Sequence, residues 1–242
     1  MTYCVGLKLN AGLVLLSDTR TNAGLDNIAC FRKMFTFELP GERIITILTA
    51  GSLSVTQTAM AVLQEAVDDP DSNEETNILK ARSMLHVARI VGQVLSDVTA
   101  DVSSKLERMS QNGASASLLL AGQRRGGEQR LFLIYQEGNF IEATSDTPYL
   151  QIGEHKYGKP ILDRVVRPET SLADAQKAVL LSMDSTLRSN LSVGMPLDLM
   201  VIEADTLKVT EERRIDADDP VFREMSQAWS AALRDAFTGI VV

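Results

Sequence analysis

The stretch that decides the fold lies at the start of the chain, where residues 2–20 read TYCVGLKLNAGLVLLSDTR. Two runs of apolar and β-branched residues, 2–9 and 13–18, are separated by Asn10, Ala11 and Gly12. Such runs on either side of a glycine-containing turn are typical of a β-hairpin. The chain is therefore expected to open with two antiparallel strands.

The length of the turn determines which residues of this hairpin face one another. If residues 10–12 form a three-residue loop with the glycine in the left-handed conformation, Cys4 faces Asp18. Thr2 then faces Arg20, and because opposed residues project to the same face of a sheet, Thr2, Asp18 and Arg20 cluster at one end. A two-residue loop shifts the register by one residue and separates them.

The remaining elements follow in blocks: strands, two helices, strands, two helices, strands and a final helix. Further strands are expected at residues 34–39, 43–48, 115–121, 130–135, 140–143, 149–152, 197–204 and 208–214, and helices at about 54–66, 84–106, 157–166, 171–187 and 219–237. Hairpin-linked strands imply antiparallel sheets, and paired helices cover one face of each. We expect a single α+β domain, residues 1–242, with two stacked antiparallel sheets between helical layers.

Composition excludes several classes of function. The net charge of −8 repels phosphate backbones, so nucleic-acid binding is not expected. No apolar run approaches the ~20 residues that cross a bilayer, and no signal peptide precedes the hairpin, so a cytoplasmic protein is expected. Two cysteines, Cys4 and Cys30, suit a reducing compartment. Two histidines without a ligand motif indicate no metal site, and no cofactor is expected.

Thr2 is the candidate nucleophile. Loss of Met1 would give Thr2 a free α-amine beside its hydroxyl, and such an amine, with a pKa of ~7.7–8.0, suits a general base at neutral pH. Threonine activated by its own amine is an established catalytic arrangement. The Lys33 cation would ease removal of the hydroxyl proton, and Asp18 would hold that lysine. The backbone N–H of Gly51, at a strand-to-helix turn, would stabilise the oxyanion.

Each of these residues also has a simpler interpretation. A threonine after the initiator methionine is common. Asp18 could pair with Arg20, and Lys33 could be an ordinary charge at a strand edge. Cys4 is expected to be a small strand residue rather than a rival nucleophile, because no histidine base lies near it in the sequence.

The combination resembles the proteasome β subunits and the bacterial peptidase of the ATP-dependent two-component system. The shared features are Thr2 at the terminus, residues 17–20 (SDTR) followed by Gly24, Lys33 before apolar residues, and residues 50–52 (AGS) before a helix. The bacterial proteasome-related family called Anbu is closer still. That likeness includes residues 1–7 (MTYCVGL), 17–24 (SDTRTNAG), 31–34 (FRKM) and 183–194 (MDSTLRSNLSVG).

This resemblance implies the four-layer αββα fold of N-terminal nucleophile hydrolases, assembly into a ring or helical ring of identical subunits, and threonine-dependent hydrolysis of peptide bonds. By the same resemblance Thr2 is nucleophile and base, Lys33 activates it, Asp18 orients Lys33, and the Gly51 N–H forms the oxyanion hole. The chain has no motor of its own, so a separate partner would unfold protein substrates.

Two departures from the family pattern concern the support of the terminal amine. Proteasome β subunits carry Asp-x-x-Ser-Gly-Gly late in the chain, whereas here Ser189 stands where the aspartate is expected and Asp184 lies further upstream. The serine-containing Gly-Ser-Gly loop of the family appears here as residues 153–155 (GEH). The candidates for a supporting role are Arg20, Asp184, Ser189 and Ser192.

Two other functions fit the same fold. One is a ring-forming subunit that is catalytically weak or silent, and the other is an amidase for a small amide or isopeptide. The presence of Thr2, Asp18 and Lys33 favours catalysis over a silent scaffold. The choice between peptides and small amides depends on pocket size and on access to the chamber.

Two surface features complete the expectations. Helix 84–106 carries Ile90 and Val94 off its main apolar stripe, which predicts that it and helix 54–66 meet a neighbouring subunit. The segment 68–77 contains five carboxylates around Pro70, and a solvated, mobile loop without a function is expected there.

Overall fold

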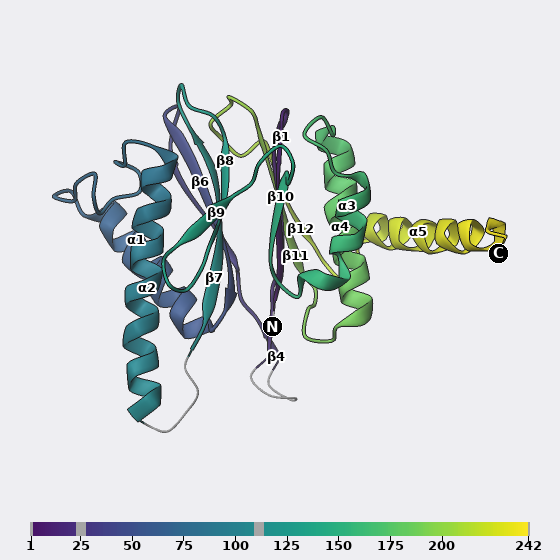
Figure 1. The fold of residues 1–242 in the computed structure, drawn as a ribbon, viewed down its shortest axis with the longest axis horizontal. Coiled ribbons are helices and arrows are strands. Elements are labelled where there is room, and N and C mark those ends of the chain that lie inside the picture. Colours follow the sequence, from purple (N-terminus) through teal and green to yellow (C-terminus); the bar gives the residue numbers. More distant parts are fainter. Residues whose placement is uncertain (1, 23–27, 109–113, 242) are drawn as a thin grey trace.

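The computed structural model describes residues 2–22, 28–108 and 114–241. Figure 1 shows four layers: helices α1 (Leu53–Asp68) and α2 (Met84–Arg108), one sheet, a second sheet, and helices α3 (Lys159–Val165) and α4 (Leu172–Ser189). Helix α5 (Pro220–Gly239) projects away from the α3–α4 layer. The αββα arrangement expected from the order of elements is confirmed.

The sheet beneath α4 has the strand order β10-β1-β2-β11-β12, and every pair of neighbours is antiparallel. Its strands are β1 (Tyr3–Leu9), β2 (Gly12–Asp18), β10 (Tyr149–Gly153), β11 (Leu197–Glu203) and β12 (Glu211–Ile215). A short 3-10 helix, η1 (His155–Tyr157), follows β10.

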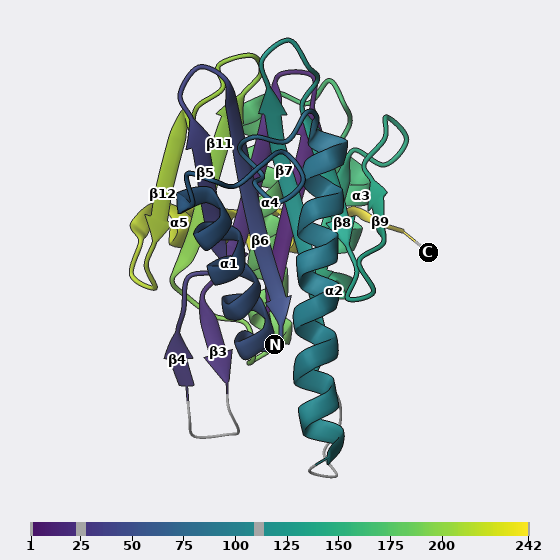
Figure 2. The ribbon, with the colours of Figure 1, turned by 90° about the vertical axis from the view of Figure 1, so that its left-hand side faces the viewer.

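The sheet beneath α1 and α2 has the order β5-β6-β7-β8-β9 and is also antiparallel. Its strands are β5 (Met34–Leu39), β6 (Arg43–Gly51), β7 (Ala116–Arg124), β8 (Arg130–Ile134) and β9 (Phe140–Glu142). A separate ribbon of β3 (Arg20–Asn22) and β4 (Ile28–Cys30) extends below the layers in Figure 2.

Three apolar clusters hold the layers together. One lies between the sheets and includes Cys4 and Leu15, while a second lies under α4 and includes Val5 and Leu16. A third lies under α1 and α2. Because β1 and β2 are covered on both faces, their residues are almost all buried, which explains why the opening stretch lacks a polar alternation.

The turn between β1 and β2 differs from the three-residue loop expected from the sequence. The observed register pairs Cys4 with Ser17 rather than with Asp18, so residues 10 and 11 alone form the turn. Gly12 is the first residue of β2, where a Cβ atom would lie 2.5 Å from the carbonyl oxygen of Ile202 on β11. The glycine therefore allows two strands to approach closely and does not serve the turn. The predicted opposition of Thr2 and Arg20 is wrong as well, since Arg20 pairs with Cys30 in the ribbon.

The wide apolar face of α2 packs largely against its own subunit. Ile90, which is expected from the sequence to meet a neighbouring subunit, is only 6% exposed and packs in the cluster beneath the helix. Val94 is half-buried against the same cluster. Much of the wide apolar face is therefore covered by the subunit itself. No helix within the described ranges is both long and apolar enough to cross a membrane.

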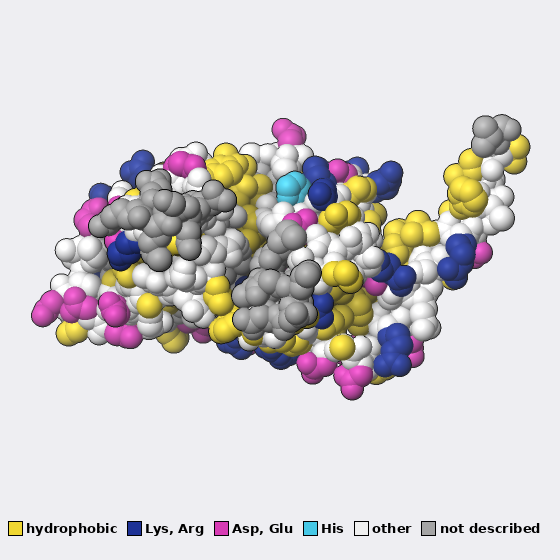
Figure 3. Space-filling model, turned by 90° about the horizontal axis from the view of Figure 1, so that it is seen from below, with side chains coloured by type: hydrophobic (Ala, Val, Ile, Leu, Met, Phe, Trp, Pro, Cys, Tyr) yellow, Lys and Arg dark blue, Asp and Glu magenta, His cyan; other side chains and the backbone are white. Residues whose placement is uncertain are grey.

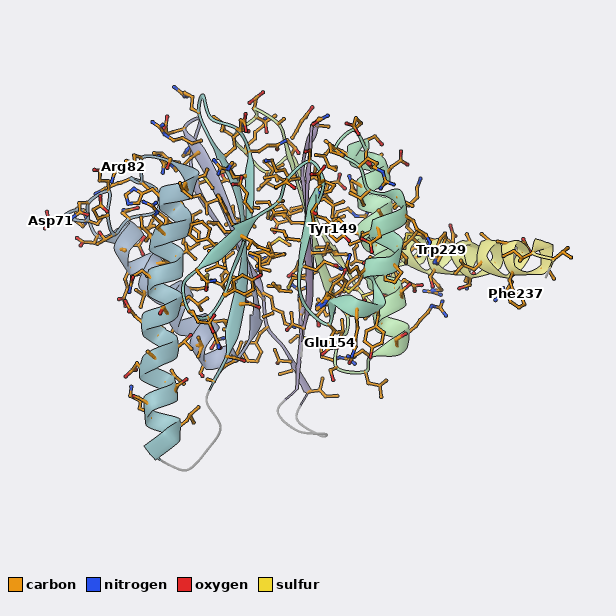
Figure 4. All side chains as sticks on the ribbon, viewed as in Figure 1. Asp71, Arg82, Tyr149, Glu154, Trp229 and Phe237 are labelled. Atoms are coloured by element: carbon orange, nitrogen blue, oxygen red, sulfur yellow. The ribbon has the colours of Figure 1, made fainter. Side chains whose placement is uncertain are left out.

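The five carboxylates of the acidic segment after α1 are exposed, as expected, but the segment also contacts α2. The Glu75 carboxylate lies 3.2 Å from the Arg82 guanidinium and 3.0 Å from His86 Nε2. Asn77 is buried and donates a hydrogen bond to the carbonyl of Ala66. Figure 4 places Asp71 and Arg82 at the outer margin of this layer.

Candidate active site

Several strand ends meet at the end of the sandwich where the chain begins. β1 starts there and β2 and β10 finish there, since Tyr3 pairs with Gly153 and Cys4 pairs with Ser17. Figure 2 shows the arrowhead of β6, which ends at Gly51, reaching the same end beside the N-terminus. This end of the molecule therefore collects residues that are distant in the sequence.

Asp18 and Lys33 form a buried ion pair at this end. Lys33 Nζ donates to Asp18 Oδ1 at 2.7 Å and to the carbonyl oxygen of Arg20 at 2.6 Å. The side chains of Asp18 and Lys33 are 0% and 3% exposed. Asp18 Oδ1 also accepts the N–H of Tyr3 at 3.1 Å, so the carboxylate is bonded to the residue that directly follows Thr2.

The second oxygen of Asp18 fixes the loop between α4 and β11. The N–H of Gly194 donates to Asp18 Oδ2 at 3.2 Å. Arg20 lies against the same loop: its Nη1 donates to the Leu191 carbonyl at 3.0 Å, and a Cβ on Gly194 would lie 2.1 Å from its Nε. Arg20 therefore positions this loop, and its guanidinium occupies the space into which a side chain at position 194 would project.

Thr2 is held at its carbonyl by the turn after β10. The residue is 5% exposed, and its carbonyl oxygen accepts the N–H of Glu154 at 2.8 Å. Gly153 has a φ of +79°, and a Cβ there would lie 1.9 Å from that oxygen. Residues 153–155 thus contribute a main-chain N–H at this end, and Figure 4 shows Glu154 near the end of the layers.

Gly51 lies beside the same turn. Its φ is +108°, and a Cβ would lie 2.3 Å from the carbonyl oxygen of Ser115, so the chain turns there in a way that only glycine allows without strain. Gly51 and Gly153 line one surface hollow of about 340 Å³. A substrate carbonyl in this hollow would lie close to both backbone turns.

Tyr3 is a residue of this region that the sequence analysis did not single out. It is fully buried, and its hydroxyl is 2.6 Å from Ser182 Oγ on α4 and accepts a hydrogen bond from Gln151 Nε2 on β10 at 2.6 Å. These bonds hold the strand directly after Thr2 against two other elements. The one aromatic residue of this strand was the available signal, because a buried hydroxyl requires partners.

The residues proposed to support the terminal amine are not gathered in one place. Asp184 lies in the contact between α4 and α5, where Oδ1 accepts the Ser226 hydroxyl at 2.8 Å and Oδ2 accepts Arg188 Nε at 3.0 Å. Ser189 is exposed at the end of α4, and Ser192 is half-buried, with its N–H bonded to Asn190 Oδ1. Met1 and Gly24 lie outside the described residues.

Burial governs the electrostatics of this end. Removal from water raises the pKa of the Asp18 carboxyl, while Lys33 and the N–H groups of Tyr3 and Gly194 act in the opposite direction. Burial likewise raises the pKa of the Cys4 thiol, which therefore stays protonated at neutral pH. Within the described residues, no group of three or more His, Cys, Asp or Glu side chains is placed to hold a metal ion.

Comparisons with known proteins agree with this geometry. The sequence profile of the proteasome subunit matches residues 2–202. Among solved structures, an Anbu Gly-1 mutant from Hyphomicrobium sp. strain MC1 is 48% identical, with a TM-score of 0.93 and coverage of 100% of this chain and 99% of that chain. A comparison with curated proteins found no match.

Two further solved structures come from other bacteria. Anbu from Yersinia bercovieri is 43% identical, with a TM-score of 0.90 and coverage of 99% of this chain and 98% of that chain. A structure described as the helical assembly of the Anbu complex from Pseudomonas aeruginosa is 44% identical, with a TM-score of 0.92 and coverage of 99% and 97%. The likeness therefore extends over the whole chain, α5 included.

Proposed function

This chain belongs to the Anbu group of proteasome subunits, and we propose that it is a threonine peptidase whose nucleophile is the Thr2 hydroxyl after removal of Met1. The observation that carries the proposal is the buried Lys33–Asp18 pair, hydrogen-bonded to the residue next to Thr2. Burying such a pair costs free energy that two apolar side chains would not. A chemical role for the pair accounts for its presence.

In the proposed reaction the free amine of Thr2 takes the proton of the Thr2 hydroxyl as Oγ attacks the substrate carbonyl carbon. The Lys33 ammonium favours the developing alkoxide, and Asp18 keeps Lys33 in place. The N–H of Gly51 stabilises the oxyanion of the tetrahedral intermediate. The amine then gives its proton to the leaving nitrogen, the C–N bond breaks, and water hydrolyses the Thr2 ester to release the second product.

Main-chain contacts position Thr2 at the place where the proteasome pattern has a serine-containing loop. The N–H of Glu154 holds the Thr2 carbonyl, and Asp18 and Arg20 hold the loop that contains Gly194. We place Arg20 in a positioning role, and we assign no catalytic role to Asp184, because both of its carboxylate oxygens are bonded in the α4–α5 contact.

The proposed active form is a homo-oligomer, as in the helical assembly of the Pseudomonas aeruginosa relative. Helix α5 offers a contact surface for a second copy. Its apolar residues recur at three- and four-residue spacing and form one stripe: Phe222, Met225, Trp229, Leu233 and Phe237. This stripe continues beyond the body of the subunit, where Leu233 is 51% and Phe237 is 79% exposed. Figure 3 shows hydrophobic side chains along this projecting helix. Apolar side chains at such spacing on an exposed helix mark an interaction site. Protein substrates would require a separate unfolding partner.

The proposal is tested by replacing the nucleophile. Thr2→Ala should abolish covalent reaction with a peptide that carries an electrophilic group, while light scattering shows an unchanged oligomer. Thr147→Ala, the same change at an exposed loop position, should react like the wild-type protein. Equal labelling of Thr2→Ala and the wild type would refute the proposal, and an assembled wild type that takes no label would indicate a silent ring-forming subunit.

A further inference from the structure

A groove leads from Gly51, the proposed oxyanion donor, towards α2. The hollow that contains Gly51 and Gly153 shares Ser115, Gln136 and Glu137 with a second hollow of about 370 Å³. The second hollow is lined by side chains of α2, namely Ser96, Thr99, Ala100 and Ser103. The two hollows are therefore contiguous, and we refer to them together as the Glu137 groove.

Among the described residues that line the two hollows, Glu137 is the one that carries a charge. The rest of the lining consists of backbone, small apolar residues and neutral polar groups such as the Ser96, Ser115 and Ser117 side chains. Glu137 is exposed, and its Oε1 accepts a hydrogen bond from Gln136 Nε2 at 2.9 Å. In the part of the chain that the structure describes, no lysine or arginine forms an ion pair with this carboxylate.

We propose that the Glu137 groove takes a lysine or arginine side chain of the substrate, next to the bond that is cleaved. The inference rests on the proposed function, because Gly51, the proposed oxyanion donor, lines the groove. A carbonyl bound at Gly51 brings the neighbouring substrate residue into the groove. A guanidinium or ammonium group can then bond to Glu137 and to the hydroxyl groups around it.

Other side chains fit this groove less well. An acidic side chain meets a like charge at Glu137, and an apolar one covers the carboxylate without offering a hydrogen bond. The net charge of −8 attracts cations to the whole subunit, so a general preference for basic peptides is not sufficient evidence. A test must separate Glu137 from the other carboxylates.

The experiment compares two sets of peptides, one varied at the residue before the cleaved bond and one at the residue after it. Within each set, the varied residue is arginine, norleucine or glutamate. The wild type should cleave the arginine peptide roughly three- to fivefold better than the norleucine peptide in kcat/KM, as expected for a partly exposed ion pair. Glu137→Gln should remove that preference. Glu128→Gln, an identical charge change in a different surface hollow, should keep it.

A binding measurement keeps the groove testable if no peptide is cleaved. In the Thr2→Ala background, fluorescence anisotropy of a labelled arginine peptide should show tighter binding than that of the norleucine peptide, and added Glu137→Gln should abolish the difference. If binding depends on Glu137 but the wild type cleaves no peptide, the proposed function is wrong, whereas the assignment of the Glu137 groove to a basic side chain is supported. Equal binding of both peptides, or a preference that survives Glu137→Gln, would overturn the groove.

Discussion

Lys33 Nζ lies 2.7 Å from Asp18 Oδ1, and the carboxylate of Asp18 simultaneously accepts the N–H groups of Tyr3 and Gly194. One buried side chain thus connects the start of β1, the residue before β5, and the loop before β11. A substitution of Asp18 would therefore remove hydrogen bonds that position all three segments.

Removal of either member of the pair should slow the reaction of Thr2. Lys33→Met and Asp18→Asn are each expected to lower the rate of covalent labelling by about 100-fold or more, the lower range for proton-transfer catalysis. Lys105→Met, which removes an exposed lysine on α2, is the matched control and should label normally. Wild-type labelling rates in a folded Lys33→Met protein would contradict the role given to the pair.

The pH dependence of labelling should show two limbs. The rate should rise with unit slope on a logarithmic scale up to the pKa of the α-amine, ~7.7–8.0, since the neutral amine is the base. The pKa of Asp18 is raised by burial, and only its ionised form can hold Lys33. Activity is therefore present above that raised pKa and is lost as the pH falls through it.

The diagnostic observation is the slope of this profile in acid. Below the pKa of Asp18 the logarithmic slope should steepen from one to two, at a pH above the usual carboxyl value of ~3.9. Labelling rates are measured from about pH 4 to about pH 9, with circular dichroism at each pH to confirm folding. A unit slope that persists until the protein unfolds would exclude a titrating Asp18.

The two cysteines should differ sharply in reactivity. Cys30 is exposed, whereas Cys4 is fully buried between the sheets, with its thiol directed to the carbonyl of Thr49. Because burial raises the pKa of Cys4, its thiolate is scarce at neutral pH. A thiol reagent should modify one cysteine per native chain and both after denaturation, as counted by mass. Native modification of Cys4 would reopen the possibility of a cysteine nucleophile.

Asp184 should prove structural. Asp184→Asn weakens the bonds to Ser226 and Arg188, so we expect a loss of about 1–3 kcal/mol in the free energy of α5 attachment. Limited proteolysis of the segment between α4 and α5 should become faster, while the rate of Thr2 labelling changes by no more than about twofold. The control is Asp174→Asn, at the exposed start of α4. A large loss of labelling in a folded Asp184→Asn protein would restore the catalytic interpretation.

Assembly should depend on the projecting part of α5. Phe237→Glu places a charge on the apolar stripe and is expected to weaken association at least tenfold, about the cost of losing an interface hot spot. Thr238→Glu, one position further on and off the stripe, should have little effect. Light scattering over a range of concentrations measures the change. An undisturbed oligomer of the Phe237→Glu variant would place the contact elsewhere.

The fold was largely predictable from the sequence because hairpins, helix pairs and their order leave few ways of burying both faces of each sheet. Lys33 and Asp18 were identified as a pair from their residue types and the family resemblance. The register of the first hairpin could not be predicted, because from the sequence alone Gly12 looks like a turn residue. Only the structure shows that it lies against Ile202 of a neighbouring strand. Such close approaches depend on strands that are distant in the sequence.

The burial of Ile90 and the partners of Asp184 could not be predicted, for the same reason. An apolar residue off the main stripe of a helix indicates a wide apolar face. Only the structure shows whether the subunit's own sheet covers that face, as it does at Ile90. Asp184 lies in a segment that resembles the family, yet its partner Ser226 comes from α5, outside the matched residues 2–202. Local sequence could not supply that contact.

The central claim is that Thr2 becomes the N-terminal residue and acts as the nucleophile. Its most direct test is the intact mass of the purified protein before and after incubation with an electrophilic peptide, followed by tandem mass spectrometry of the modified chain. We predict a chain that lacks Met1 and gains one adduct, located on Thr2. A chain that retains Met1 and takes no label, or an adduct located on Cys4, Cys30 or another residue, would contradict the account.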